Sequence, residues 1–274
     1  MKTWENTFNP RDIFWNKICR QKFCFISTPE NFENNKVRGL KWLKKQQLKD
    51  NASYCCDGNY IYENLDEFKK FKNSKILVVA GGPTASQRDW DVDEYDYVFS
   101  CNHFYKFEKL KNKKVDLFFV GNEVNTNDQD FLDYCNKYQS LIGVEDLEYR
   151  PDHVKNLVKN FPNKTFLCLS RFQGKIGVAP KLIILAVCLG AKQVDFVGVD
   201  GTPPNYKQGK IALHSFEKNK IFACNYSDDL LLSHYKTLKD FLYNDIGKNV
   251  IFNNLGENHE YNNFSKVWYI IKKS

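Results

Sequence analysis

Residues 75–85 read KILVVAGGPTA, a continuous apolar run that ends in two glycines, a proline and a threonine. A continuous apolar run of this length is typical of a strand that is buried on both faces of a parallel sheet. Gly81 and Gly82 suit a tight turn, and Pro83 suits the first turn of a helix. The stretch therefore predicts a buried strand, a turn and the start of a helix.

The same alternation of strand and helix continues beyond this stretch. Apolar runs predict strands at 75–80, 96–100, 115–120, 140–143, 165–169, 194–199 and 249–253. Helical patterns lie between them at 127–138, 151–161, 178–190 and 229–244. Continuous apolar strands that alternate with helices predict an α/β fold with a Rossmann-like, mostly parallel sheet and helices on both faces.

Two segments depart from this pattern. Residues 1–73 are polar and aromatic, with helical candidates at 37–50 and 63–73. We expect them to form an N-terminal helical extension, and residues 74–274 to form the α/β domain. Residues 201–228 contain two prolines and little periodicity. Long irregular segments after a core strand are often functional, so we expect a lid there.

Composition sets limits on location and partners. The 274 residues carry a net charge of +7, no run approaches about 18 apolar residues, and the first residues lack the apolar core of a signal peptide. We expect a cytoplasmic protein with an anionic ligand and no nucleic-acid partner, since no nucleic-acid-binding motif is present. Lysines 41, 44, 45 and 49 suggest a solvated helix face, with a lipid- or acceptor-binding patch as the alternative. Peripheral contact with the inner face of a membrane would follow from lipid binding.

The sequence predicts no metal site. The nine cysteines are odd in number and match no zinc spacing. Asp91 and Asp93 have the D-x-D form of a glycosyltransferase metal motif, but they follow the first helix instead of a strand in the middle of the sheet. We interpret them as part of an exposed turn.

Small and uncharged residues end several of the predicted strands. The first ends in GGPT, the second in Ser100-Cys101-Asn102, and the third in Gly121-Asn122. Ligands of open parallel sheets bind outside the carboxyl ends of the strands, and a Gly-rich turn into a helix attracts phosphate. An acidic residue, which nicotinamide cofactors require after the second strand, is missing there. We expect a nucleotide at this edge, with a plain strand-to-helix turn as the alternative interpretation of GGPT.

Four motifs carry a family resemblance: VVAGGPT, SCNHFY, LFFVGN and LAVCLGAKQVDFVGVD, which span roughly residues 75–200. Residues 230–254 give a weaker match. In order and spacing these motifs resemble the bacterial sialyltransferases of glycosyltransferase family 42 and the related motility-associated glycosyltransferases. The resemblance implies a GT-A-like variant of the Rossmann fold and an inverting, metal-independent transferase. Its donor would be sialic acid, or a related acidic sugar such as Kdo, linked to CMP, and its acceptor a glycan or lipid-linked glycan. No cofactor is implied besides the donor.

The resemblance also assigns donor-binding residues. By motif match these are Gly81, Gly82, Pro83 and Thr84 for the phosphate, Asn102 and Asn122 for phosphate and ribose, and Gly198, Val199 and Asp200 for ribose and cytosine. Two departures stand out. Gly81 replaces the family's asparagine, and no serine or threonine lies beside Gly177, the other position assigned to the donor.

Inverting transfer also requires a base that takes a proton from the acceptor, and histidine suits neutral pH. The resemblance points to a histidine near the lid, which leaves His214, within it, and His234, on the following helix. Tyr206 is expected to assist the departing phosphate.

Two other functions stay open from the sequence. One is a Mg²⁺- and ATP-dependent diphosphokinase similar to the archaeal pterin pyrophosphokinases, although no carboxylate cluster for the metal is visible in the sequence. The other is a non-catalytic nucleotide-binding protein. The oligomeric state also stays open.

Overall fold

The computed structural model describes residues 24–27, 60–62, 66–121, 123–145, 151–170, 178–201, 211, 213–220, 239, 242–243 and 247–259. The strands are β1 (Cys24–Ser27), β2 (Tyr60–Tyr62), β3 (Lys75–Val79), β4 (Tyr97–Cys101), β5 (Leu117–Phe119), β6 (Leu141–Glu145), β7 (Thr165–Ser170), β8 (Gln193–Val197) and β9 (Ile251–Asn254). The α-helices are α4 (Thr84–Gln87), α5 (Gln129–Tyr138), α6 (Pro151–Asn160) and α7 (Val178–Cys188). Short 3₁₀ helices are η3 (Asp66–Phe71), η4 (Val92–Glu94) and η5 (Asn102–Lys106).

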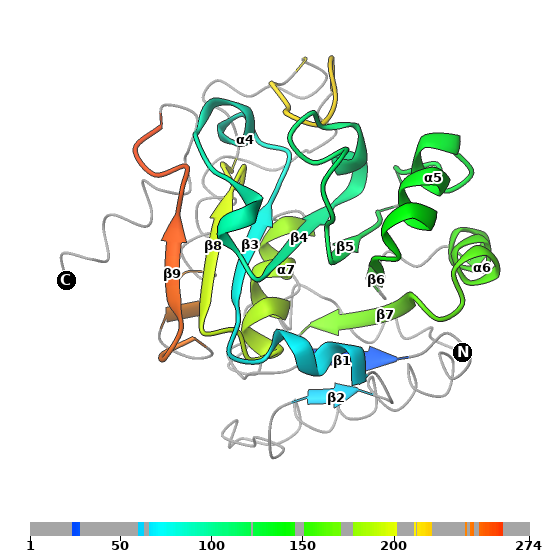
Figure 1. Ribbon diagram of the computed structural model, residues 1–274, viewed down its shortest axis with the longest axis horizontal. Helices are drawn as coiled ribbons and strands as arrows, with labels where there is room; N and C mark the ends of the chain where they lie inside the picture. The colour runs from blue at the N-terminus through cyan, green and yellow to red at the C-terminus, as the bar shows by residue number, and fades with distance from the viewer. Residues whose placement is uncertain are drawn as a thin grey trace, which may run out of the picture.

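One sheet organises the described residues, with the strand order β2-β1-β7-β6-β5-β4-β3-β8-β9 (Figure 1). The seven strands from β7 to β9 in this order all run parallel. They are the seven strands predicted from the apolar runs, and α5, α6 and α7 are three of the four predicted helices. The prediction of an α/β domain with a parallel sheet and packed helices is therefore confirmed.

The centre of the sheet is buried because its strands are apolar along their whole length. In β3, the residues from Ile76 to Val79 are fully buried. Helix α7 packs against strands β3, β4, β5, β7 and β8, and its residues from Ala179 to Cys188 are all buried. A helix that is apolar around its whole circumference is stable only inside a core, which is where α7 lies.

The segment before residue 74 differs from the predicted helical extension. Strand β1 pairs antiparallel with β7, and β2 pairs parallel with β1, so the extension adds two strands to the edge of the same sheet. The helical candidate at 63–73 forms the 3₁₀ helix η3 over part of its length. The candidate at 37–50 lies outside the described residues, as does most of the helix predicted at 229–244.

The D-x-D pair lies on the surface, as predicted. The Asp91 side chain accepts a hydrogen bond from the backbone N–H of Asp93 at the start of η4, and Asp93 itself pairs with Lys113. Within the described residues, no helix has the length and apolar character needed to cross a membrane.

The order of the strands reverses between β3 and β8. From β3 the chain adds β4, β5, β6 and β7 on one side, and it then returns to add β8 and β9 on the other side. In open α/β sheets, ligands bind outside the carboxyl ends of the strands at such a switch point. The turns after β3 and β8 are therefore the first place to look for a functional site.

Candidate functional site

The turns after β3 and β8 are bonded to each other through Thr84 and Asp200. The Thr84 backbone N–H donates to Asp200 Oδ2 at 2.8 Å, and its hydroxyl donates to Oδ1 at 2.5 Å. The hydroxyl oxygen in turn accepts from the Gly198 N–H at 2.9 Å, and the Gly82 N–H donates to the Gly198 carbonyl at 2.9 Å. Thr84 and Asp200 are both buried. We call this hydrogen-bonded pair, Thr84 and Asp200, the floor of the switch point.

This floor leaves little room for side chains at the glycines. A Cβ atom on Gly82 would collide with the Asp200 carboxylate and with the Gly198 carbonyl oxygen. A Cβ atom on Gly81 would collide with the imidazole ring of His214. The two glycines therefore permit a close approach between the β3 turn, the β8 turn and the segment that carries His214.

Replacing Thr84 with valine should lower the free energy of unfolding by about 2–3 kcal/mol, because a buried carboxylate loses a hydrogen-bond donor and the Gly198 N–H loses its acceptor. Serine at this position keeps the hydroxyl and removes one methyl group, which is worth only about 0.8 kcal/mol. Urea denaturation of both variants measures the difference. Equal losses for valine and serine would show that the Thr84 hydroxyl does not stabilise the floor.

Residues 213–220, which belong to the predicted lid, are anchored on the β3 turn. The Ser215 N–H donates to the Gly81 carbonyl at 2.7 Å, and the Ser215 hydroxyl donates to the Gly82 carbonyl at 2.7 Å. Ser86 contacts the same hydroxyl at 2.9 Å. The buried ring of Phe216 packs on Phe107. These contacts hold the segment over the carboxyl end of β3.

The imidazole of His214 lies against the β3 turn in its neutral form. Its pKa is lowered to about 4, mainly by burial and next by the positive charge of Lys220, with a smaller contribution from His103, while the charge of Glu217 opposes the shift. His214 Nδ1 accepts a hydrogen bond from the Phe216 N–H at 3.3 Å. In the neutral ring the hydrogen therefore resides on Nε2.

A second group of polar side chains follows β4 and β5. Asn102 has a left-handed backbone (φ 53°), its Oδ1 accepts from the Gly121 N–H at 2.9 Å, and its Nδ2 donates to Glu123 Oε1 at 2.5 Å. Lys220 Nζ lies 2.5 Å from Glu217 Oε2 and 3.2 Å from Glu123 Oε1. Asn102 and Lys220 thus connect the ends of two strands to the anchored segment.

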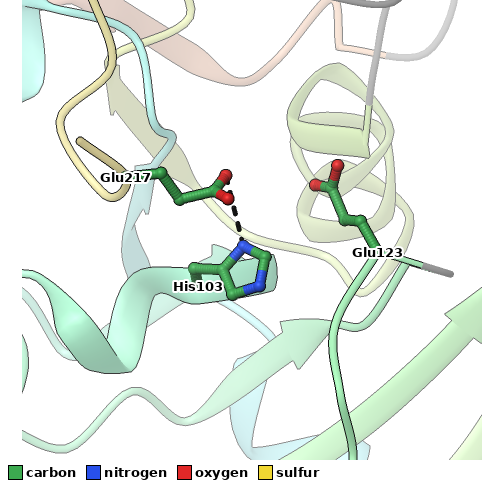
Figure 2. Close-up of side chains that lie close together, drawn as sticks. All are labelled: His103, Glu123 and Glu217. Carbon is green, nitrogen blue, oxygen red and sulfur yellow. Dashed lines mark ion pairs between the residues drawn. The ribbon is translucent and has the colours of Figure 1, made fainter. Parts of the chain in front are cut away.

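His103 completes this cluster (Figure 2). Its Nδ1 lies 3.2 Å from Glu217 Oε2, and the Glu123 side chain lies on the other side of the imidazole.

Two members of the cluster have shifted pKa values. Burial alone would raise the pKa of Glu217, but the hydrogen bond from Lys220 and the neighbouring positive charges outweigh this effect and lower that pKa. Burial alone would likewise lower the pKa of Lys220, and its two carboxylate partners raise it instead. Both side chains are therefore charged at neutral pH.

The structure brings most of the described predicted residues to one edge of the sheet. Gly81, Gly82, Pro83, Thr84, Gly198, Val199, Asp200 and His214 surround the switch point, and Asn102 lies at the end of the neighbouring strand β4. Asn122, Gly177, Tyr206 and His234 lie outside the described residues. For all of these residues, contact with a donor stays a prediction.

Several residues of this edge were not assigned from the sequence. They are Ser86, His103, Glu123, Ser215, Glu217 and Lys220. Glu123 had a signal, because it directly follows a strand end. Glu217 and Lys220 had none beyond their place in the predicted lid.

Comparison with known proteins gives no further assignment. No protein-family model matches the chain. No curated protein matches it either.

Proposed function

We propose that the protein is an inverting glycosyltransferase of the GT-A-like type, which moves sialic acid or a related acidic sugar from a CMP-linked donor to a glycan acceptor. The observation that carries the proposal is the position of the segment with His214 and Lys220. It is anchored over the end of β3, beside the switch point of a parallel sheet. A nucleotide site needs polar and cationic groups at this edge.

The polar groups suggest a division of roles. The N–H groups of Gly82 and Thr84 already bond to Gly198 and Asp200, so these residues shape the site from below. The ammonium of Lys220 and the Nε2–H of His214 are the groups suited to the negative charge that develops on a departing phosphate. No metal ion is required for this charge compensation.

We propose His214 as the base for the acceptor hydroxyl, a role that excludes donation from the same Nε2 to the departing phosphate in the same step and leaves that charge to Lys220. In this role Nε2 must offer a lone pair, so the hydrogen must shift to Nδ1 and the Phe216 bond must be given up. A bond of 3.3 Å contributes only about 1 kcal/mol, which lowers the population of the required tautomer about fivefold. A bound phosphate nearby would raise the pKa of His214 from about 4 toward neutrality, where a base is more effective.

One observation favours a second candidate, the metal-dependent diphosphokinase. Glu123 and Glu217 approach His103 closely enough to form a group of metal-ligating atoms, which is the carboxylate cluster that the sequence alone does not reveal. Kinases of this type hold ATP through a divalent ion.

Calorimetry of the full chain with CMP, CTP, ATP and NAD, each with and without Mg²⁺, separates the candidates. The transferase predicts CMP binding without a metal, and the diphosphokinase predicts ATP binding only with Mg²⁺. A mass-spectrometric screen of CMP-linked sugars then identifies the donor. Binding of none of the four nucleotides would refute both candidates.

Replacing Asn102 with alanine should weaken CMP binding about tenfold, because its amide orients both the Gly121 turn and Glu123. Asn73 provides a matched control. It has the same left-handed backbone (φ 60°) but precedes β3, at the opposite end of the strand. The Asn73→Ala variant should bind CMP like the wild type. Unchanged affinity in Asn102→Ala would argue against a CMP site at this edge.

A further inference from the structure

Three potential metal ligands converge at the carboxyl edge from three separate segments. His103 follows β4, Glu123 follows β5, and Glu217 belongs to the segment anchored on the β3 turn. One ligand atom from each lies within 4.8 Å of the other two (Figure 2). An imidazole nitrogen and two carboxylates form a common ligand set for divalent ions of the first transition row.

The imidazole of His103 gives an independent reason to expect a ligand. The residue is 9% exposed, and its Nδ1 makes no hydrogen bond although Glu217 Oε2 lies 3.2 Å away. A buried polar atom without a hydrogen bond costs about 1–3 kcal/mol, so native proteins rarely retain one without a function. An imidazole nitrogen that lies beside a carboxylate oxygen without a hydrogen bond between them has the arrangement that two neighbouring ligands of one cation would share.

The charges of the cluster also favour a divalent ion. Glu123 and Glu217 supply two negative charges, and the ammonium of Lys220, which contacts both, supplies one positive charge. One negative charge therefore remains in excess. The Lys220 side chain is 21% exposed, so its ammonium has a route to solvent when another cation takes its place.

The geometry requires the three ligand atoms to move slightly closer together. A metal ion binds nitrogen and oxygen ligands at about 2.0–2.2 Å, so adjacent ligands lie about 3–3.6 Å apart and opposite ones at most about 4.4 Å. His103 Nδ1 and Glu217 Oε2, which are 3.2 Å apart, already suit adjacent positions, and all three ligand atoms lie within 4.8 Å of one another. Glu123 is on the surface and can supply the movement, and the amide of Asn102 already holds its carboxylate toward the cluster.

We propose that His103, Glu123 and Glu217 bind one divalent cation of the Mn²⁺ or Zn²⁺ type, in competition with the ammonium of Lys220. Three protein ligands leave coordination positions open for oxygen atoms of a substrate or of water. The proposal goes beyond the proposed function, which requires no metal. Binding of the ion would extend the transferase by a metal-responsive site and would not by itself turn it into a kinase.

Titration of the full chain with Mn²⁺ alone, followed by electron paramagnetic resonance, tests the site without any nucleotide. Mn²⁺ is the appropriate probe because nine cysteines would compete for Zn²⁺. The wild type should bind one Mn²⁺ ion. Glu217→Gln and Glu123→Gln should each weaken binding at least about tenfold, and Lys220→Met should strengthen it about tenfold, because the competing ammonium is gone.

Lys113→Met is the matched control. Lys113 also pairs with a carboxylate, that of Asp93, but lies outside the cluster, so this variant should bind Mn²⁺ like the wild type. Circular dichroism verifies that each variant is folded, and Glu123→Gln, a surface change, preserves the test if Glu217→Gln unfolds. Absence of saturable Mn²⁺ binding by the wild type below about 1 mM would overturn the proposal. So would equal affinities of the wild type and the Glu123→Gln and Lys220→Met variants. Because no nucleotide is present, neither result depends on the transferase proposal.

Discussion

Replacing Gly198 with alanine is expected to lower the free energy of unfolding by about 2–5 kcal/mol, through two costs that add. Gly198 has a φ of 73°, and a left-handed backbone costs a residue with a Cβ atom about 1–2 kcal/mol. The new Cβ would also collide with the Ala80 carbonyl oxygen, a backbone atom that cannot move aside. Such overpacking in a filled interior costs about 1–3 kcal/mol more.

Gly190→Ala separates the two costs. Gly190 also has a left-handed backbone (φ 89°), but its nearest contact would be Lys72 Cγ at 3.3 Å, in a flexible side chain. This variant should therefore lose only the conformational part, about 1–2 kcal/mol. Urea denaturation monitored by circular dichroism measures both changes. Equal losses would mean that the turns after β3 and β8 lie too far apart at the switch point for a Cβ on Gly198 to reach Ala80.

The parallel sheet could be predicted because its strands are continuous apolar runs. The interior strands β3 and β8 are buried after their first residues, Lys75 and Gln193, and beyond these only Asp195 in β8 is polar. Helix α7 was predictable for the same reason, since its eleven residues are almost entirely apolar. Segments that are buried on all sides can be recognised in the sequence as nearly uninterrupted apolar runs.

Strands β1 and β2 could not be predicted in this way. They have four and three residues, which is too short for any periodicity to be recognised. What makes them strands is pairing with a distant edge, as in the contact between β1 and β7. That edge lies more than a hundred residues away in the sequence, so local propensity carries no information about it.

The candidate site was predictable to a similar, partial extent. The turns at Gly81 and Gly198 could be inferred, because the carboxyl ends of parallel strands share one edge. The bonding of Asp200 to Thr84, in contrast, depends on the distance between two turns more than a hundred residues apart. The positions of Glu217 and Lys220 depend on how the irregular segment folds back, and no spacing rule describes that.

His214→Ala should reduce the turnover of the transferase by about 10²–10⁴-fold, the usual contribution of a general base. CMP affinity should change little, because the base acts on the acceptor and not on the nucleotide. Steady-state kinetics with the donor found in the screen, together with calorimetry of CMP, measure the two effects. If His214→Ala retains activity while His234→Ala is inactive, the base has been assigned to the wrong histidine.

His214→Gln then tests which property of the imidazole matters. A glutamine amide can donate a hydrogen bond from a position near Nε2, but it cannot accept a proton at neutral pH. If His214 is the base, glutamine should be as inactive as alanine. If His214 only donates to the leaving phosphate, as the bond from the Phe216 N–H to Nδ1 favours, glutamine should restore much of the activity lost in His214→Ala. Such restoration would assign the base to another residue and leave His214 with the leaving group, where its neutral, Nε2-protonated ring already suits the task.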